Sequence, residues 1–367
     1  MTDIEQHTTL TDRSVPTKNI TVEDTQALSS QSSPSAEYEE LAVVIAISAG
    51  EFSRRKLKKY IFSQIEDSTE ATVLIIDGVK PSWGRDIFDS LKDHRTRSTW
   101  NVVTENLTIK IMPSWIHDCI QPWWVETVTQ MSITGLMTSI ERRQIRTFMG
   151  TTLEFQSGPY MNSRKEPDLF VIPKLAVDSL PSVAFEVGWS ESHKKLKADV
   201  DLLLTGGDGS INVVVVVKWK KHRLSQRVHG FADVYVRDVF GIPVLRQHEV
   251  IFPASLVLSI PVLNLPVLLV PTPIVATGPT HRMATRSSTR PPAPLPAPNL
   301  RPPPPSPPLP TGGPQRLIFS HEEVFGPTFL QDPACNGPPP ATIDLEINLL
   351  REFASECLQE MNLQPAV

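Results

Sequence analysis

The sequence predicts an α/β protein built around a mixed β-sheet that is flanked by helices. Three observations within residues 168–218 lead to this prediction. Two short apolar strands, L-F-V-I and V-A-F-E-V, follow each other closely. A helical pattern comes next, and the run V-V-V-V-V then reads as a strand that is buried on both faces. The order β-β-α-β with a fully apolar last strand is typical of helices packed on a sheet.

Composition divides the chain into ordered and linker-like parts. Of its 367 residues 35 are proline, and 13 of these prolines fall between positions 291 and 314, which excludes regular helix or sheet there. The polar N-terminus lacks hydrophobic periodicity, which is typical of a disordered tail. We therefore expect a disordered tail over 1–38, an α/β domain over 39–275 with its core at about 105–220, a Pro-rich disordered linker over 276–341 and an amphipathic helix over 342–367.

Regular patterns begin at Leu41. The run L-A-V-V-I-A-I predicts a strand or the start of a buried helix, S-R-R-K-L-K-K-Y-I-F a basic helix, and A-T-V-L-I-I-D-G a strand that ends in a turn. A second helix is expected over Gly84–Lys92. Leu107, Ile109 and Ile111 then alternate as on one face of a strand.

A longer helix is expected after Ser114. Its apolar positions Ile116, Ile120, Trp124 and Val128 recur at helical spacing. Pro122 lies inside this pattern, so it either kinks the helix or delays its start. A helix or turn over Ile140–Arg146 leads to a strand near Leu153.

Two carboxylates mark the segment that follows. Pro167 fixes the approach to Asp168, which lies at the start of the first apolar strand, and Glu186 lies within the second. Ser190 suits the N-cap of the next helix, which extends to about Leu204 before the valine-rich strand. Further strands are expected over 234–239, 249–252 and 256–260.

Each carboxylate has a structural alternative. An aspartate after proline at a strand start is often a turn or capping residue, so Asp168 alone indicates little. Glu186 is more informative, because a charge inside an apolar strand is costly unless it is paired, hydrated or bound to a metal. The alternative for Glu186 is an ion pair with a neighbouring lysine.

The segment from about 105 to 220 resembles the PD-(D/E)XK superfamily, which has the restriction-endonuclease-like fold. It is most similar to a group of uncharacterised fungal proteins within that superfamily. Five matching motifs carry the resemblance: M-P-S-W-I-H-D at Met112–Asp118, K-E-P-D at Lys165–Asp168, E-V-G-W-S-E-S at Glu186–Ser192, L-K-A-D at Leu196–Asp199 and the valine-rich strand at Ile211–Lys218.

The resemblance implies a magnesium site. Asp168 and Glu186 would be the ligands, and Asp118, beside His117, falls where many members place an additional acid. Members carry a lysine two residues after the second acid to orient or activate the attacking water, but Gly188 stands there. Lys197 and Lys218 are the candidates to replace that lysine, and Lys194 and Lys195 are weaker ones. The alternative for each of these lysines is a solvent-exposed side chain without a role in the site.

Two functions follow as hypotheses. The first is a magnesium-dependent phosphodiesterase that acts on DNA or RNA. The second is a catalytically inactive nuclease-fold scaffold or interaction protein. Whether the chain is an enzyme stays open at this point, because the motif lysine is missing.

Nucleic acid binding would depend on local features, since the net charge of -5 and the pI near 6.0 give no overall attraction to phosphate. The basic runs Arg54–Lys59 and Arg142–Arg146 are candidates, with a solvated helix face as the alternative. Trp123 and Trp124 could stack on bases, but tryptophans in an apolar helix usually belong to the core.

The Pro-rich segment suggests a protein partner. Arg301, Pro304 and Pro307 match the R-x-x-P-x-x-P spacing that an SH3-type domain binds. The alternative is an ordinary linker, because proline-dense segments produce such matches by chance. The terminal helix either folds back on the domain or binds a partner.

The cellular location is predicted from the absence of a secretory signal and of a membrane-spanning pattern in the sequence. The N-terminus has neither the basic start nor the apolar core of a secretory signal, and Cys119, Cys335 and Cys357 form no C-x-x-C pair. Five prolines interrupt the apolar stretch Ile251–Val275, so we expect no membrane span there, with membrane association as a weaker alternative. A cytoplasmic or nuclear location is expected.

Overall fold

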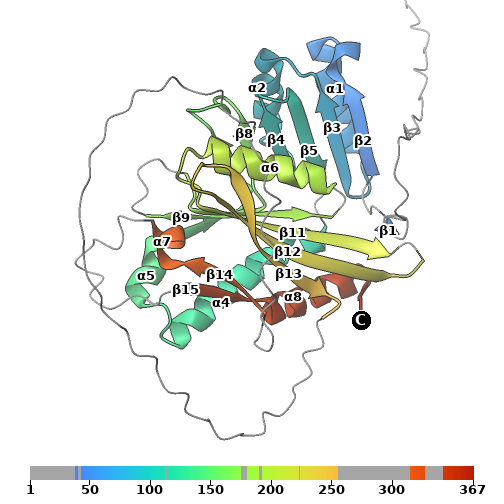
Figure 1. Ribbon diagram of the computed structural model, residues 1–367. Helices are drawn as coiled ribbons and strands as arrows, with labels where there is room; N and C mark the ends of the chain where they lie inside the picture. The colour runs from blue at the N-terminus through green and yellow to red at the C-terminus, as the bar shows by residue number, and fades with distance from the viewer. Residues whose placement is uncertain are drawn as a thin grey trace, which may run out of the picture. The chain divides into compact units, whose positions relative to one another are not determined.

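The computed structural model describes most of the chain from residue 38 onward. The described ranges are 38–39, 43–111, 114–174, 180–189, 192–222, 224–254, 315–326 and 342–367. Nearly all of the predicted N-terminal tail, much of the predicted linker and the candidate SH3-binding residues lie outside them. Within these ranges the protein is a mixed α/β structure with several β-sheets, as predicted at the level of fold class (Figure 1).

The largest sheet, which we call the central sheet, contains the predicted core. Its main path has the strand order β13-β12-β11-β10-β9-β6, with β1 paired to β11 and β16 paired to β12. The strands are β1 (Tyr38–Glu39), β6 (Ile145–Phe148), β9 (Leu169–Pro173), β10 (Val183–Gly188), β11 (Val213–His222), β12 (Arg227–Arg237), β13 (Pro243–Phe252) and β16 (Gln364–Pro365).

The predicted β-β-α-β order is confirmed in the middle of this sheet. Strand β10 runs antiparallel to β9 and parallel to β11, and α6 (His193–Gly206) makes the crossover between the parallel pair. Alternation along β10 divides the core into two layers. Phe185 packs on one face against Trp123 and Trp124, while Ala184 packs on the other face against Leu196 of α6.

A second sheet precedes the central one in sequence, and we call it the N-terminal sheet. Its order is β2-β3-β5-β4-β8-β7, so the structure contains two large sheets rather than the single mixed sheet expected from sequence. The strands are β2 (Val43–Ser48), β3 (Thr72–Asp77), β4 (Thr96–Asn101), β5 (Asn106–Ile111), β7 (Leu153–Glu154) and β8 (Arg164–Lys165). A separate apolar core joins this sheet to η2 (Ala49–Glu51), α1 (Arg54–Asp67) and α2 (Pro81–Asp89).

Pro122 delays the start of a helix, which was one of the two predicted outcomes. A short helix, α3 (Trp115–Asp118), ends before Cys119, and α4 (Ile120–Ile133) begins after it. Pro122 is the third residue of α4, where a backbone N–H has no partner within the helix in any case. The capped helix α5 (Ser139–Gln144) then leads into β6.

The linker prediction is wrong for residues 315–326. They form β14 (Arg316–Ser320) and α7 (His321–Phe325), and Leu317, Phe319 and Phe325 belong to the core of the central sheet. Strand β14 pairs with β15 (Thr342–Glu346), so the terminal helix α8 (Ile347–Glu360) begins five residues later than predicted. Helix α8 folds back on the domain through its apolar face: Ile347, Leu350, Ala354 and Leu358 are all buried.

The start of α6 also differs from the prediction. Its N-cap is Ser192, whose Oγ accepts a hydrogen bond from the Lys195 backbone N–H at 3.2 Å. Ser190, which we expected to be the cap, lies outside the described residues. Both serines of the S-E-S motif suit the cap, because short hydroxyl side chains satisfy the first backbone N–H groups of a helix.

None of the described helices is long and apolar enough to cross a membrane. Most of the apolar stretch Ile251–Val275 falls outside the described residues.

Candidate functional site

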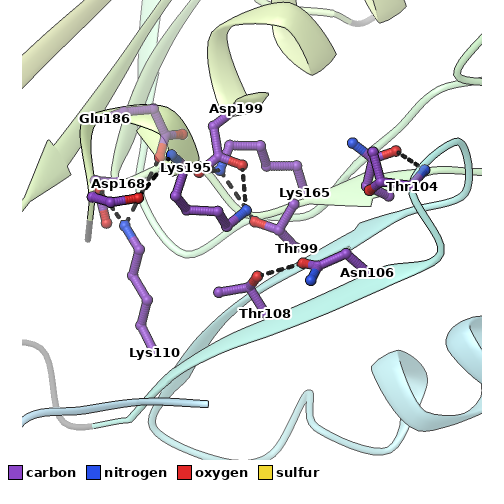
Figure 2. Close-up of polar contacts among 12 residues, drawn as sticks. Thr99, Thr104, Asn106, Thr108, Lys110, Lys165, Asp168, Glu186, Lys195 and Asp199 are labelled. Atoms are coloured by element: carbon purple, nitrogen blue, oxygen red, sulfur yellow. Dashed lines mark hydrogen bonds and ion pairs between the residues drawn. The ribbon is translucent and has the colours of Figure 1, made fainter. Parts of the chain in front are cut away.

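Asp168 and Glu186 lie close together in a buried ion cluster. Asp168 directly precedes β9 and Glu186 is the fourth residue of β10, and antiparallel pairing of these strands brings the two side chains to the same region (Figure 2). The Asp168 Oδ2 atom accepts a hydrogen bond from the backbone N–H of Val187 at 2.7 Å, which ties the aspartate to the neighbouring strand.

Lys110 joins the two carboxylates. Its Nζ atom lies 3.2 Å from Asp168 Oδ2 and 3.9 Å from Glu186 Oε2, and it donates to the backbone carbonyl of Val187 at 3.3 Å. Lys110 comes from β5 of the N-terminal sheet, so the cluster spans both large sheets. One ammonium group is therefore in contact with three oxygens of the central sheet.

A second lysine approaches Glu186 from another strand. Lys165 is the last residue of β8, and its Nζ lies 3.1 Å from Glu186 Oε2 and 3.4 Å from Asp199 Oδ2. It also donates to Thr99 Oγ1 at 3.1 Å. Lys195, one turn before Asp199 on α6, completes the cluster at 2.9 Å from Asp199 Oδ1.

The charges of the cluster shift the pKa values of its two aspartates. Burial alone would raise the pKa of Asp168, but Lys110, His117 and the Val187 N–H outweigh burial and hold it below its usual range. Burial opposes ionisation of Asp199 as well, yet Lys165 and Lys195 lower its pKa to about 2. Both aspartates are therefore ionised at neutral pH.

Glu186 behaves differently because it is completely buried. Its exposed fraction is 0%, and this burial raises its pKa to about 8, even though Lys165 and Lys110 oppose the shift. Neither carboxyl oxygen of Glu186 has a hydrogen-bond partner within the described part of the chain. Burial thus disfavours the ionised form of Glu186, and the ion pairs with Lys165 and Lys110 at Oε2 oppose this effect.

Gly188 leaves no space for the side chain expected in the motif. A Cβ atom built at this position would lie 2.5 Å from Leu196 Cδ1 and 3.1 Å from both Leu196 Cγ and Cδ2. Leu196 belongs to the buried layer between α6 and the central sheet. The leucine fills the space into which a lysine at position 188 would have to extend.

The two lysines proposed as replacements make other contacts. Lys197 is exposed on α6, where its charge acts on Asp201. Lys218 is buried and pairs in register with Gly188, but its ammonium donates to the backbone carbonyl of Trp189 at 3.1 Å. The contacts to Glu186 come from Lys110 and Lys165 instead.

Asp118 lies close enough to Asp168 for the two charges to interact. It is exposed at the end of α3, where partial burial raises its pKa; Arg97 opposes this effect and the negative charge of Asp168 adds to it. His117 is buried, and its Nδ1 lies 2.9 Å from Ser114 Oγ. The additional acid of the motif is thus an outer neighbour of the carboxylate pair.

Of the other predicted nucleic-acid contacts, the two tryptophans are structural, whereas the arginines and most lysines of the two basic runs are exposed. Trp123 and Trp124 are buried in the core, and their indole N–H groups donate to Glu346 O and Thr147 Oγ1. The core position, which was the preferred interpretation of both tryptophans, is confirmed, so these two rings are not available to stack on bases. Within the basic run on α1, Arg54 and Lys58 approach Asp86 of α2 at 3.8 and 3.9 Å.

Sequence reasoning missed three members of the cluster, namely Lys110, Lys165 and Asp199. Lys165 and Asp199 stand in matched motifs but received no role there. Lys110 had a weaker signal, a lysine inside an alternating apolar strand. It contacts Asp168 across 58 positions of sequence, and strand patterns carry no information about which sheets meet.

The site contains few metal ligands of its own. A search of the described residues for groups of three or more His, Cys, Asp or Glu side chains that could hold a metal ion finds none. Two cavities, of about 520 and 480 Å³, lie elsewhere, beside α2 and between α4 and α8, and neither is lined by a member of the cluster. Among the described residues, Lys110 Nζ approaches two carboxylate oxygens and one backbone carbonyl oxygen.

Comparison with known proteins identifies no family for this chain. No family model matches this chain, and no curated protein matches it either.

Proposed function

We propose that this chain is a nuclease-fold protein of the PD-(D/E)XK type that hydrolyses phosphodiester bonds with a magnesium ion held at Asp168 and Glu186. The observation that carries the proposal is the convergence of Asp168 Oδ2, Glu186 Oε2 and Val187 O on one cationic group, the Lys110 ammonium, at 3.2, 3.9 and 3.3 Å. Carboxylate and carbonyl oxygens are the protein ligands that Mg²⁺ accepts. The donor set therefore fits this ion.

The fold around the site is compatible with this proposal. The acids stand on adjacent antiparallel strands of a mixed sheet, with α6 packed on the same face as Glu186 and α4 on the opposite face. A mixed sheet flanked by helices is what the resemblance implies. The N-terminal sheet is not part of what the resemblance implies.

Lys165 supplies the positive charge that the sequence motif lacks. Its ammonium stands 3.1 Å from Glu186, and Thr99 and Asp199 hold it there. Burial opposes the charge on Lys165, but Asp199 and Glu186 outweigh burial and raise its pKa, so the group stays cationic. Lys165 thereby favours the ionised form of Glu186, which a metal ligand requires.

The chemistry of the proposed reaction is simple. A bound magnesium ion would neutralise the charge that develops on the phosphate and lower the pKa of a bound water. The chain holds the ligand oxygens in place: the Val187 N–H orients Asp168, and Lys165 lies beside Glu186. Asp118, exposed next to Asp168, marks the side from which a substrate approaches.

A second function is favoured by one observation. Glu186 is completely buried and Leu196 fills the space beside Gly188, so the cluster also suits a structural ion network in an inactive scaffold. In that case the nuclease fold would be retained for its shape, and no metal would bind.

A cleavage assay distinguishes the two functions. The full chain is incubated with MgCl2 and with single-stranded and double-stranded DNA and RNA. The proposal predicts cleavage that Asp168→Asn and Glu186→Gln abolish and that the control Asp233→Asn retains. Asp233 is a suitable control because it is similarly buried but lies on β12, two strands away from Glu186, and pairs with His248 of β13. Absence of cleavage of all four substrates by the folded wild-type protein would favour the scaffold.

A further inference from the structure

Lys110 occupies the position of the cation in the proposed site. Its Nζ contacts the same three oxygens that would bind magnesium, and its side chain is only 9% exposed. A divalent ion bound to these oxygens would lie within about 4 Å of the ammonium, where two positive charges repel each other strongly in a buried site. The ammonium and the ion therefore exclude each other.

We infer that Lys110 is a built-in competitor for the metal, so that the site is closed until the Lys110 side chain moves away. This inference rests on the proposed function, because it concerns the same magnesium site. It assigns a regulatory role to the N-terminal sheet, which supplies Lys110 from β5. The central sheet supplies the ligands, and the N-terminal sheet supplies the group that blocks them.

The backbone of Lys110 is fixed, but its side chain can move. Strand β5 pairs with β3 on one side and with β4 on the other, and Lys110 lies in register with Val73 and Arg97. A lysine ammonium sits on a flexible four-carbon chain, so it can leave the carboxylates without a change in the sheet. Rotamer changes of this side chain would therefore open the site.

The alternative is that Lys110 is the amine that acts during cleavage. Geometry argues against it, because Lys110 lies among the ligand oxygens, with a hydrogen bond to the Val187 carbonyl. Lys165 lies beside Glu186 and has its own partners in Thr99 and Asp199. Two lysines thus occupy different positions, and only Lys110 is in the place of the ion.

An anionic substrate is the natural partner of the displaced ammonium. A phosphodiester that approaches from the side of the exposed Asp118 would present negative charge to Lys110, and this charge would compensate for the lost contacts to Asp168 and Glu186. Metal and substrate would then bind with positive coupling, since each stabilises the arrangement with Lys110 withdrawn. Without substrate, the wild-type protein should bind magnesium weakly.

Magnesium titration tests the inference without relying on cleavage. Isothermal titration calorimetry of the folded protein with MgCl2 should show at least tenfold tighter binding for Lys110→Met than for wild type. Lys58→Met is the control for loss of a lysine outside the site, because Lys58 lies on α1 near Asp86, and its affinity should stay at the wild-type value. Equal or weaker binding by Lys110→Met would overturn the inference while leaving the proposed site intact.

The outcomes separate this inference from the proposed function. If neither the wild type nor Lys110→Met binds magnesium, the proposed function fails, and the inference fails with it. If both bind with the same affinity, only the inference fails. Lys110→Met leaves two buried carboxyl groups without one of their cations, so a second test uses the wild type.

The second test measures how accessible Lys110 is. Amine-labelling of the wild type, read out by mass spectrometry, should modify Lys110 slowly in EDTA and severalfold faster with saturating MgCl2, because the displaced ammonium reaches solvent. Labelling of the exposed Lys197 serves as the internal reference. An unchanged labelling rate of Lys110 at saturating magnesium would contradict the inference.

Discussion

Lys165 and Glu186 lie 3.1 Å apart, with both side chains at most 1% exposed. This pair places an amine beside the second acid, although the sequence has glycine where the motif has lysine. The amine comes from the K-E-P-D motif on β8 of the other sheet. Its presence adds support to the proposal that the two carboxylates form a working site.

The pH dependence of stability should reveal the buried carboxyl group of Glu186. Its pKa is about 8 in the folded protein against an ordinary value near 4.5. The folded state therefore holds the proton more tightly, and the stability from this group is present below about pH 4.5 and is lost as pH rises towards 8. Relative to wild type, Glu186→Gln should gain stability with rising pH, by at most about 1.4 kcal/mol per pH unit.

Urea unfolding in EDTA between pH 5 and pH 8 measures this effect. The quantity that matters is the difference in unfolding free energy between Glu186→Gln and wild type, because all other titrating groups are shared. A difference that stays constant over this range would show that Glu186 is ionised in the folded protein.

Asp199 should be important for stability because it holds two lysines. Asp199→Asn leaves Lys165, which is fully buried, with only Glu186 as an ion-pair partner, and removes the partner of Lys195. Breaking a buried ion pair in this way costs about 3 to 5 kcal/mol. Asp201→Asn, on the same helix and less buried, should change stability by no more than about 0.5 kcal/mol.

Asp199 should also affect how the stability of the protein changes in acid. Because the folded pKa of Asp199 is about 2, below its ordinary value, its contribution is present above about pH 4 and is lost as pH falls towards 2. Unfolding midpoints measured at pH 7 and pH 3 should therefore differ less for Asp199→Asn than for wild type. An equal difference in the two proteins would contradict this role.

Restoring the motif lysine should not be possible at position 188. Even Gly188→Ala should cost about 1 to 3 kcal/mol, because the added Cβ would meet Leu196 Cδ1 at 2.5 Å. Truncating Leu196 makes room, so Gly188→Ala combined with Leu196→Ala should be less destabilising than the sum of the single changes. Additive free energies in this double-mutant cycle would show that Leu196 does not limit the side chain at 188.

Two single substitutions test whether β14 is buried in the core. Leu317→Ala should cost about 2 to 5 kcal/mol, because Leu317 is fully buried, whereas Ile318→Ala should cost far less, because Ile318 is 45% exposed. Two neighbouring residues of one strand thus serve as test and control. Equal small effects would mean that residues 315–326 are the linker predicted from sequence.

The order of elements around the carboxylates was predictable because local patterns determine it. Alternating and continuous apolar runs identify β9, β10 and β11, and helical spacing identifies α6. Residues 315–326 also carry a local signal, the alternation of R-L-I-F-S and a capping box from Ser320 to Glu323. The proline-dense surroundings outweighed that signal.

The ion cluster was only partly predictable because its members come from different sheets. Asp168 and Glu186 stand out as charges in apolar strands, but Lys110 and Lys165 gain their roles from the meeting of the N-terminal and central sheets. The resemblance gave Lys197, on the following helix, and Lys218, on the adjacent strand, as the candidates to replace the motif lysine. Distance along the chain is a poor guide here, since neighbouring strands bring remote residues together.

The most direct test of the account is to locate a metal in crystals soaked with MnCl2, since Mn²⁺ accepts the same oxygen ligands as Mg²⁺ and is visible by anomalous scattering. The account predicts one anomalous peak bonded to Asp168, Glu186 and the Val187 carbonyl, with the Lys110 ammonium withdrawn. Crystals at saturating Mn²⁺ with no peak at these oxygens and Lys110 still between the carboxylates would contradict it.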